Sequence, residues 1–172
     1  ELVQMDDWTG TNTFELDLLG RLQKMTDHKG NTVSYTYDAV GNQTSITYPD
    51  GSKVSNFYDA VYNLTSVIDA EKGTYAYVYD DANRPVKLTY PNGWIEQYTY
   101  DAEGNLLKTV DTDPFQLYNK TPKVKYEYTY DAEGNALTEF QRDSDATENL
   151  KSRTTFTYDA LNRLTGSTRK LE

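Results

Sequence analysis

The sequence predicts an all-β fold, built as a repetitive antiparallel array of β-hairpins. Three observations carry this prediction: a 21-residue repeat, alternation of aromatic and polar side chains, and turn residues about every ten positions. The aspartates of the repeated Tyr-Asp motif, at positions 17, 38, 59, 80, 101, 131 and 159, lie 21, 21, 21, 21, 30 and 28 residues apart. We therefore expect a single array over residues 1–172, with about seven repeats and insertions in the last of them, excised from a longer chain.

The first strand of each repeat ends just before the aspartate. Aromatic residues lie one and three positions before the aspartate, and a polar residue lies between them, as in Tyr35-Thr36-Tyr37. This period of two indicates a strand with one aromatic and one polar face. The repeated motif residues are Tyr37, Asp38, Gly41, Tyr58, Asp59, Tyr79, Asp80, Tyr100, Asp101, Gly104, Tyr130, Asp131, Gly134, Tyr158 and Asp159, with a weaker copy at Leu16-Asp17.

The second strand of each repeat follows the turn. Its apolar residues lie three positions apart, as Leu64 and Val67 do, and as Leu22 and Met25 do. Strict alternation would place such a pair on opposite faces of the sheet. We therefore expect either a β-bulge or a strand with a two-sided environment.

Two turns complete each repeat. In Asp101-Ala102-Glu103-Gly104 the aspartate can cap a type I turn while Gly104 adopts positive φ, as in a hairpin closed by a G1 bulge. Tyr90-Pro91-Asn92-Gly93 has the same features, with proline presetting φ. Seven repeats imply about fourteen short strands, and residues 1–10 look like the second half of an earlier repeat. The motif glycine is replaced at Tyr62, Asn83 and Asn162.

The composition limits the function. Leu, Ile, Val and Phe make up only 33 of 172 residues, but 16 tyrosines supply large side chains to bury, so we expect a folded chain. The net charge of −10 argues against binding to nucleic acid or anionic lipid. Cysteine is absent, which excludes disulfides and thiol nucleophiles. The sequence has no apolar run of membrane-spanning length, so membrane insertion is not expected.

These residues resemble the YD-repeat, or Rhs-repeat, family, which is named for the Tyr-Asp dipeptide. Nearly the whole chain takes part, since the motif, the 21-residue period and the Pro-Asp-Gly turn at residues 49–51 coincide. The resemblance implies an antiparallel sheet that spirals and forms part of a hollow β-shell, as in bacterial Rhs toxins, wall-associated proteins, toxin-complex cocoons and teneurins. It also implies a secreted or cell-surface location.

Catalysis and metal binding find little support. The single histidine, His28, lies in a turn-like segment without a partner for a nucleophilic or zinc site, so we expect no enzyme activity and no cofactor. Asp111, Asp113 and the acidic residues of 143–148 could bind calcium, but they lack the spacing of an EF-hand loop, which favours a solvated acidic loop. A single turn of helix is expected over residues 145–151.

The aromatic face carries the one candidate ligand site. Trp94 lies at even separation from Tyr98 and Tyr100, so all three fall on this face and could stack against a sugar ring. Packing of the same rings within the shell is the favoured interpretation.

Three functions follow from these observations. The first is a non-catalytic segment of a YD-repeat shell, which encapsulates a toxic C-terminal polypeptide or forms a secreted or cell-surface scaffold. Its partner would be the remainder of its own polypeptide, both shell and C-terminal cargo. The alternative is binding of carbohydrate or another surface ligand by the aromatic face. The third, hydrolysis by an Asp/Glu pair, rests only on the abundance of carboxylates.

The first strand predicts a further property. Leu2, Val3 and Met5 lie there with little charge to prevent pairing with another chain. We therefore expect either self-association through this edge or an edge covered by the terminal residues.

Overall fold

The computed structural model describes residues 2–113, 122–143 and 149–172, and every regular element in these ranges is a β-strand. The strands follow one another in chain order in a 15-stranded, unclosed sheet. The strand pairs within it are antiparallel. This arrangement confirms the predicted all-β class. It also confirms the strand estimate, because the strand formed by residues 2–7 precedes the fourteen that were expected.

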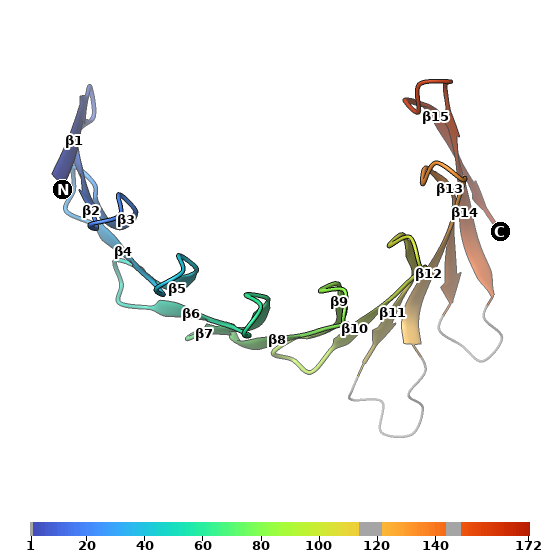
Figure 1. The fold of residues 1–172 in the computed structure, drawn as a ribbon, viewed down its shortest axis with the longest axis horizontal. Coiled ribbons are helices and arrows are strands. Elements are labelled where there is room, and N and C mark those ends of the chain that lie inside the picture. The colour runs from blue at the N-terminus through green and yellow to red at the C-terminus, as the bar shows by residue number, and fades with distance from the viewer. Residues whose placement is uncertain (1, 114–121, 144–148) are drawn as a thin grey trace. The chain divides into compact units, whose positions relative to one another are not determined.

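The chain divides into two compact units, residues 1–76 and 77–172. The first unit contains β1 (Leu2–Asp7), β2 (Gly10–Leu16), β3 (Leu22–Thr26), β4 (Thr32–Tyr37), β5 (Gln43–Thr47), β6 (Lys53–Tyr58), β7 (Leu64–Asp69) and most of β8 (Gly73–Tyr79). The second contains the end of β8 and then β9 (Pro85–Thr89), β10 (Ile95–Tyr100), β11 (Leu106–Thr112), β12 (Pro122–Tyr130), β13 (Ala136–Asp143), β14 (Leu150–Tyr158) and β15 (Leu164–Leu171). Within each unit the strands form one layer, joined by turns (Figure 1).

A β-bulge follows each Tyr-Asp turn whose pairing is described. Across β6 and β7, Tyr58 pairs with Leu64 and Asn56 pairs with Val67, with a register shift between residues 57 and 58. The shift places Leu64 and Val67 on the same face, because Tyr58 and Asn56 are two residues apart. The expected bulge is therefore confirmed, and it explains the spacing of three.

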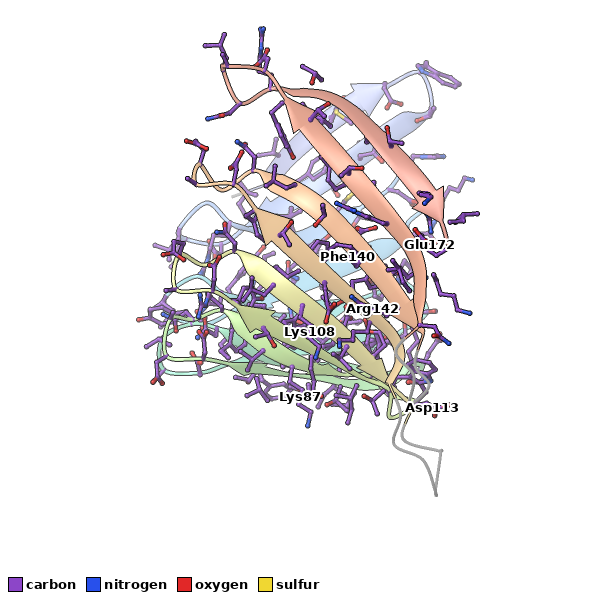
Figure 2. The ribbon with its side chains drawn as sticks, turned by 90° about the vertical axis from the view of Figure 1, so that its right-hand side faces the viewer. Lys87, Lys108, Asp113, Phe140, Arg142 and Glu172 are labelled. Atoms are coloured by element: carbon purple, nitrogen blue, oxygen red, sulfur yellow. The ribbon has the colours of Figure 1, made fainter. Side chains whose placement is uncertain are left out.

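The register also separates a face that carries the motif tyrosines from a mainly polar face, on which Phe140 is an aromatic exception. Tyr98 and Tyr100 lie on one face of β10, while Thr99, which pairs with Lys108, lies on the other. On the polar face of the second unit, Lys108 pairs with Glu127, and Glu127 pairs with Phe140. Figure 2 shows Lys108 and Phe140 along the middle of their strands, and Asp113 at the end of β11 opposite to its Tyr-Asp turn.

Neither face builds a hydrophobic core in the described ranges, where no hydrophobic side chain is fully buried. The tyrosines of the motif are half-buried, and Trp8 is 96% exposed. The tyrosine side chains are therefore only partly buried, because one layer of strands leaves both faces in contact with solvent. The most buried side chains are Asn12, Ser45, Thr109, Lys125, Thr138 and Ser152.

Candidate functional site

The feature that recurs throughout the chain is the Tyr-Asp turn. Asp101 N–H donates to the carbonyl of Asn105 over 3.0 Å, and Gly104 N–H donates to the carbonyl of Asp101 over 3.3 Å. Gly104 has a φ of 97°. These contacts confirm the predicted type I turn with a G1 bulge.

The side chain of the aspartate holds this turn from within. Asp101 Oδ1 accepts the backbone N–H of Asn105 over 2.7 Å, and Asp101 Oδ2 accepts Nδ2 of the same residue over 2.9 Å. In the other Tyr-Asp turns the aspartate makes the same pair of contacts to the fourth residue after it. Those fourth residues are Arg21, Asn42, Asn63, Arg84, Asn135 and Arg163.

Sequence reasoning missed the role of this fourth residue. The signal was present, because every repeat has Asn or Arg at that position, and both can donate two hydrogen bonds to one carboxylate. Turn chemistry alone predicts the aspartate as a cap for backbone groups only. The structure shows a cap closed by a second side chain.

These hydrogen bonds shift the titration of the turn aspartates. The pKa of Asp101 is held below its usual value, chiefly by the Nδ2 group of Asn105. Burial opposes this effect, and backbone N–H groups of the turn add to the lowering. The pKa of Asp80 is lowered first by the backbone N–H of Arg84. Both carboxylates are therefore ionised and structural at neutral pH.

The tyrosine of the motif connects neighbouring repeats. Tyr37 Oη donates to the carbonyl of Leu22 over 2.8 Å, and this carbonyl lies five residues after the aspartate of the preceding repeat. Four other motif tyrosines donate to the equivalent carbonyl: Tyr58 to Gln43, Tyr100 to Pro85, Tyr130 to Leu106 and Tyr158 to Ala136. Each phenol therefore joins its own repeat to the one before it.

Two arginines make a second connection of this kind. Arg84 Nη1 donates to the carbonyl of Asp101 over 3.0 Å, and its guanidinium carbon lies 4.7 Å from the centre of the Tyr100 ring. Arg21 makes the same contacts, to the Asp38 carbonyl over 3.2 Å and to the Tyr37 ring at 4.6 Å. The fourth residue thus contacts the next turn as well as its own.

The three repeats without the motif glycine keep the backbone of the turn. Tyr62, Asn83 and Asn162 have φ values of 70°, 60° and 58°. Asparagine tolerates this left-handed region, whereas tyrosine is strained there. The turn chemistry therefore overrides the preference of the residue.

The predicted ligand-binding residues Trp94 and Tyr100 have different surroundings. Trp94 lines a pocket with Tyr90, Glu96 and Asp111. The Tyr100 ring is covered by Arg84, and its hydroxyl is used by the Pro85 carbonyl. One face of the Tyr100 ring is therefore occupied, and sugar binding at Trp94, Tyr98 and Tyr100 stays a prediction.

Other sequence candidates lie in turns. His28 is exposed in a turn capped by Asp27. In the described ranges no three side chains of His, Asp or Glu are placed to hold a metal ion. The single turn of helix expected over residues 145–151 is wrong at its end, because Leu150 and Lys151 lie in strand β14. The rest of that prediction, and the calcium prediction for residues 144–148, lie outside the described residues. Of the segments that the structure describes, none is a helix long and apolar enough to cross a membrane.

Comparison of the sequence with family models gives one match, to the RHS Repeat. It covers residues 17–53, 58–93 and 79–114, which is more than half of the chain. No curated protein sequence matches the chain.

The fold is similar to several solved structures. The crystal structure of TcdB2-TccC3-Cdc42 aligns with a TM-score of 0.74 and 20% identity, over 92% of this chain and 9% of that one. The Tc holotoxin pore of Photorhabdus luminescens aligns with a TM-score of 0.70 and 20% identity, over 94% of this chain and 9% of that one. The chain thus spans 9% of the length of these structures. At this identity the likeness concerns the fold.

Proposed function

The chain belongs to the RHS repeat family, and we propose on this basis that residues 1–172 form a non-catalytic segment of one continuous YD-repeat wall. The observation that carries the proposal is the use of the repeated polar groups. The aspartate, its fourth residue and the tyrosine hydroxyl bind to one another or to a neighbouring repeat. A residue type repeated for catalysis would instead leave reactive groups turned toward a substrate.

We further propose that this wall helps to enclose a polypeptide in its parent protein and that it acts outside the producing cell. The support is the fold, which is similar to Tc toxin structures over more than 90% of this chain. A one-layer sheet without a core is suited to a wall, because it bounds a space with few residues. The partner would be the remainder of the same polypeptide, including its cargo. A surface scaffold without cargo is the other form of the same proposal.

Limited proteolysis tests enclosure. The complete polypeptide encoded with this chain is digested under native conditions, and the fragments are identified by mass spectrometry. Enclosure predicts a protected fragment besides the array. A variant in which Asp101→Ala and Asp131→Ala open two turns should release that fragment to the protease. Digestion of every segment outside the array, with the array intact, would contradict enclosure and leave the scaffold form.

Carbohydrate binding by the aromatic face is not favoured. Its platform would need open, adjacent rings, and Arg84 covers the ring of Tyr100. The remaining aromatic group, at Trp94, has two carboxylates beside it, which point to a different ligand.

A further inference from the structure

A small pocket lies on the aromatic face of the second unit, away from the Tyr-Asp turns. It has a volume of about 270 Å³ and is lined by Tyr90, Asn92, Trp94, Ile95, Glu96 and Asp111. These residues come from the turn between β9 and β10, from β10 and from β11. A space of this size lies just below the usual range of small-molecule pockets, about 300–1,000 Å³, and fits a head group better than a chain of sugars.

Two carboxylates face each other in this pocket. Glu96 pairs directly with Asp111 across β10 and β11, so both side chains lie on the same face. Glu96 Oε2 accepts the hydroxyl of Tyr90 over 3.0 Å, and Glu96 also accepts a hydrogen bond from Tyr98. In the part of the chain that the structure describes, neither carboxylate has a basic partner.

Asp111 is the less satisfied of the two. It is half-buried and accepts no hydrogen bond from a described residue. Its partial burial, and then the charge of Glu96, raise the pKa of Asp111 above its usual value. Two like charges across a strand pair destabilise each other, and partial burial weakens the screening of their repulsion. A cation placed between them would relieve this repulsion.

The walls of the pocket suit such a cation. Tyr90 and Trp94 are aromatic, and an organic cation over an aromatic face is attracted by the ring quadrupole, most strongly by tryptophan. A neutral sugar could stack on the same rings, but it would leave the paired carboxylates uncompensated. A small inorganic cation holds its hydration shell tightly and has no carbon atoms to pack against these walls.

We propose that this pocket binds an alkylammonium or guanidinium group, such as the head group of a lysine or arginine side chain. Glu96 and Asp111 supply the negative charge, and Tyr90 and Trp94 contact the carbon atoms next to it. The source of the group is either a free amine or a side chain of a polypeptide that lies along this face. The inference goes beyond the proposed wall function and does not depend on it.

Fluorescence of Trp94 tests the proposal. The chain has two tryptophans, so Trp8→Phe leaves Trp94 as the only reporter. This variant is titrated with tetramethylammonium, with N-acetyl-lysine methylamide, with the peptide Gly-Gly-Lys-Gly-Gly and with methyl glucoside at constant ionic strength. The cations should give a saturable change and methyl glucoside none. An affinity for the peptide well above that for the single amino acid identifies a polypeptide as the source.

A charge-neutral variant assigns the site. In the Trp8→Phe background, Asp111→Asn should weaken cation binding about tenfold, as expected when one partner of a partly buried charge pair is lost. Glu133→Gln removes the same charge from an exposed turn of the same unit and should leave the affinity unchanged. In the unaltered chain, the carboxyl carbon resonance of Asp111 should move during the titration, which keeps the test valid if the variant fails to fold. Equal binding of methyl glucoside, no saturable response to any cation, or an unchanged affinity of Asp111→Asn would overturn the proposal.

Discussion

Tyr62 occupies a backbone position that favours glycine. Its φ of 70° lies in the left-handed region, where Gly41, Gly104 and Gly134 lie in other repeats. The side chain of Tyr62 is 58% exposed, so its packing offsets little of the backbone strain. The turn is held nevertheless, because Tyr62 N–H donates to the Asp59 carbonyl over 3.1 Å.

Replacing this tyrosine should stabilise the protein. Tyr62→Gly removes left-handed strain, and we expect the free energy of unfolding to rise by about 1 kcal/mol. Val61→Gly is the matched control, since Val61 is exposed in the same turn but has no positive φ. It should lower stability, because glycine adds only entropy to the unfolded chain. Urea unfolding of both variants measures the difference, and a loss of stability in Tyr62→Gly would contradict the strain.

The motif hydroxyl can be tested in the same way. Tyr130→Phe removes the hydrogen bond to the Leu106 carbonyl and should lower the free energy of unfolding by about 1 kcal/mol. Tyr130→Ala should cost about 2 kcal/mol, less than a fully buried aromatic residue, because its ring is half-buried. Tyr48→Phe, at an exposed tyrosine, is the control and should change stability by less than about 0.5 kcal/mol. Equal losses at Tyr48 and Tyr130 would contradict a stabilising role of the hydrogen bond from Tyr130 to the Leu106 carbonyl.

The hairpin with its Tyr-Asp turn is the structural module of this chain. Each module is closed by its aspartate, and five of them are joined to the preceding module by a hydrogen bond of the motif tyrosine. At the fourth position, Arg21 and Arg84 also reach forward to the next turn. Asparagine at this position has a shorter reach, although Asn135 Nδ2 still donates to Asn162 Oδ1 over 3.1 Å.

This forward contact predicts unequal effects of one substitution. Arg84→Asn keeps the fourth-residue contact to Asp80, as the asparagine repeats show, but loses the Asp101 carbonyl and the Tyr100 ring. We expect a loss of about 1–2 kcal/mol, from one charged hydrogen bond and one cation–π contact. Arg163→Asn is the control, since Arg163 contacts Asp159 in the same way but has a side chain that is 73% exposed, against 31% for Arg84. Thermal unfolding should show that the stability of Arg163→Asn lies within about 0.5 kcal/mol of the parent. Similar losses in both variants would contradict a stabilising role of the contact between Arg84 and the next turn.

The elements could be predicted because their information is local. The period of two fixes the strands, Asp101 and Gly104 fix the turn, and the spacing of Leu64 and Val67 indicates the bulge. The hydrogen bonds of the motif tyrosines could not be predicted, since the partner of Tyr130 is a backbone carbonyl 24 residues away. The pairing of Glu96 with Asp111 depends on register across two strands, which the turn at Asp101 determines only together with its bulge.

Without a core, each unit depends on contacts between neighbouring strands. In the described ranges, burial of apolar side chains is incomplete everywhere, and polar groups in the turns recur with every repeat. Stability in such arrays is approximately a sum of module and neighbour contributions. Conditions that act on every turn should therefore act on the whole molecule.

Acid is such a condition. A carboxylate with a lowered folded pKa contributes stability above its unfolded pKa, and this stability is lost as pH falls through the folded pKa. The turn aspartates, Asp101 and Asp80 among them, belong to this class. Asp111, with a raised pKa, acts in the opposite sense and becomes less destabilising on protonation. We expect the melting temperature to be constant around neutral pH. It should decrease at pH values below about 4, which is near the unfolded pKa of aspartate.

Single substitutions identify the source of this acid sensitivity. Asp101→Asn should be less stable at neutral pH and should lose less stability on acidification than the parent chain does. Glu103→Gln, on the same turn with an exposed side chain, should follow the parent at every pH. Melting curves recorded by circular dichroism between neutral pH and about pH 2 measure both. An unchanged pH dependence in Asp101→Asn would contradict the assignment.

The sheet has an open strand at each end. β1 pairs only with β2 and β15 only with β14 among the described strands, so each leaves a row of backbone groups open. On β1, Leu2, Val3 and Met5 are 64%, 42% and 49% exposed. Such an edge favours pairing with another strand, whereas the net charge of −10 opposes close approach of two copies.

Salt should therefore promote self-association of residues 1–172. Added salt screens the repulsion between copies and leaves the backbone pairing of the edges intact, so sedimentation should show a concentration-dependent increase in mass at high ionic strength. Val3→Lys places a charge on the open edge and should suppress the association. Gln23→Lys adds the same charge to an exposed position of β3, an interior strand, and should leave it unchanged. Equal suppression by both variants would indicate a general effect of charge, and the open edge would then not be the contact.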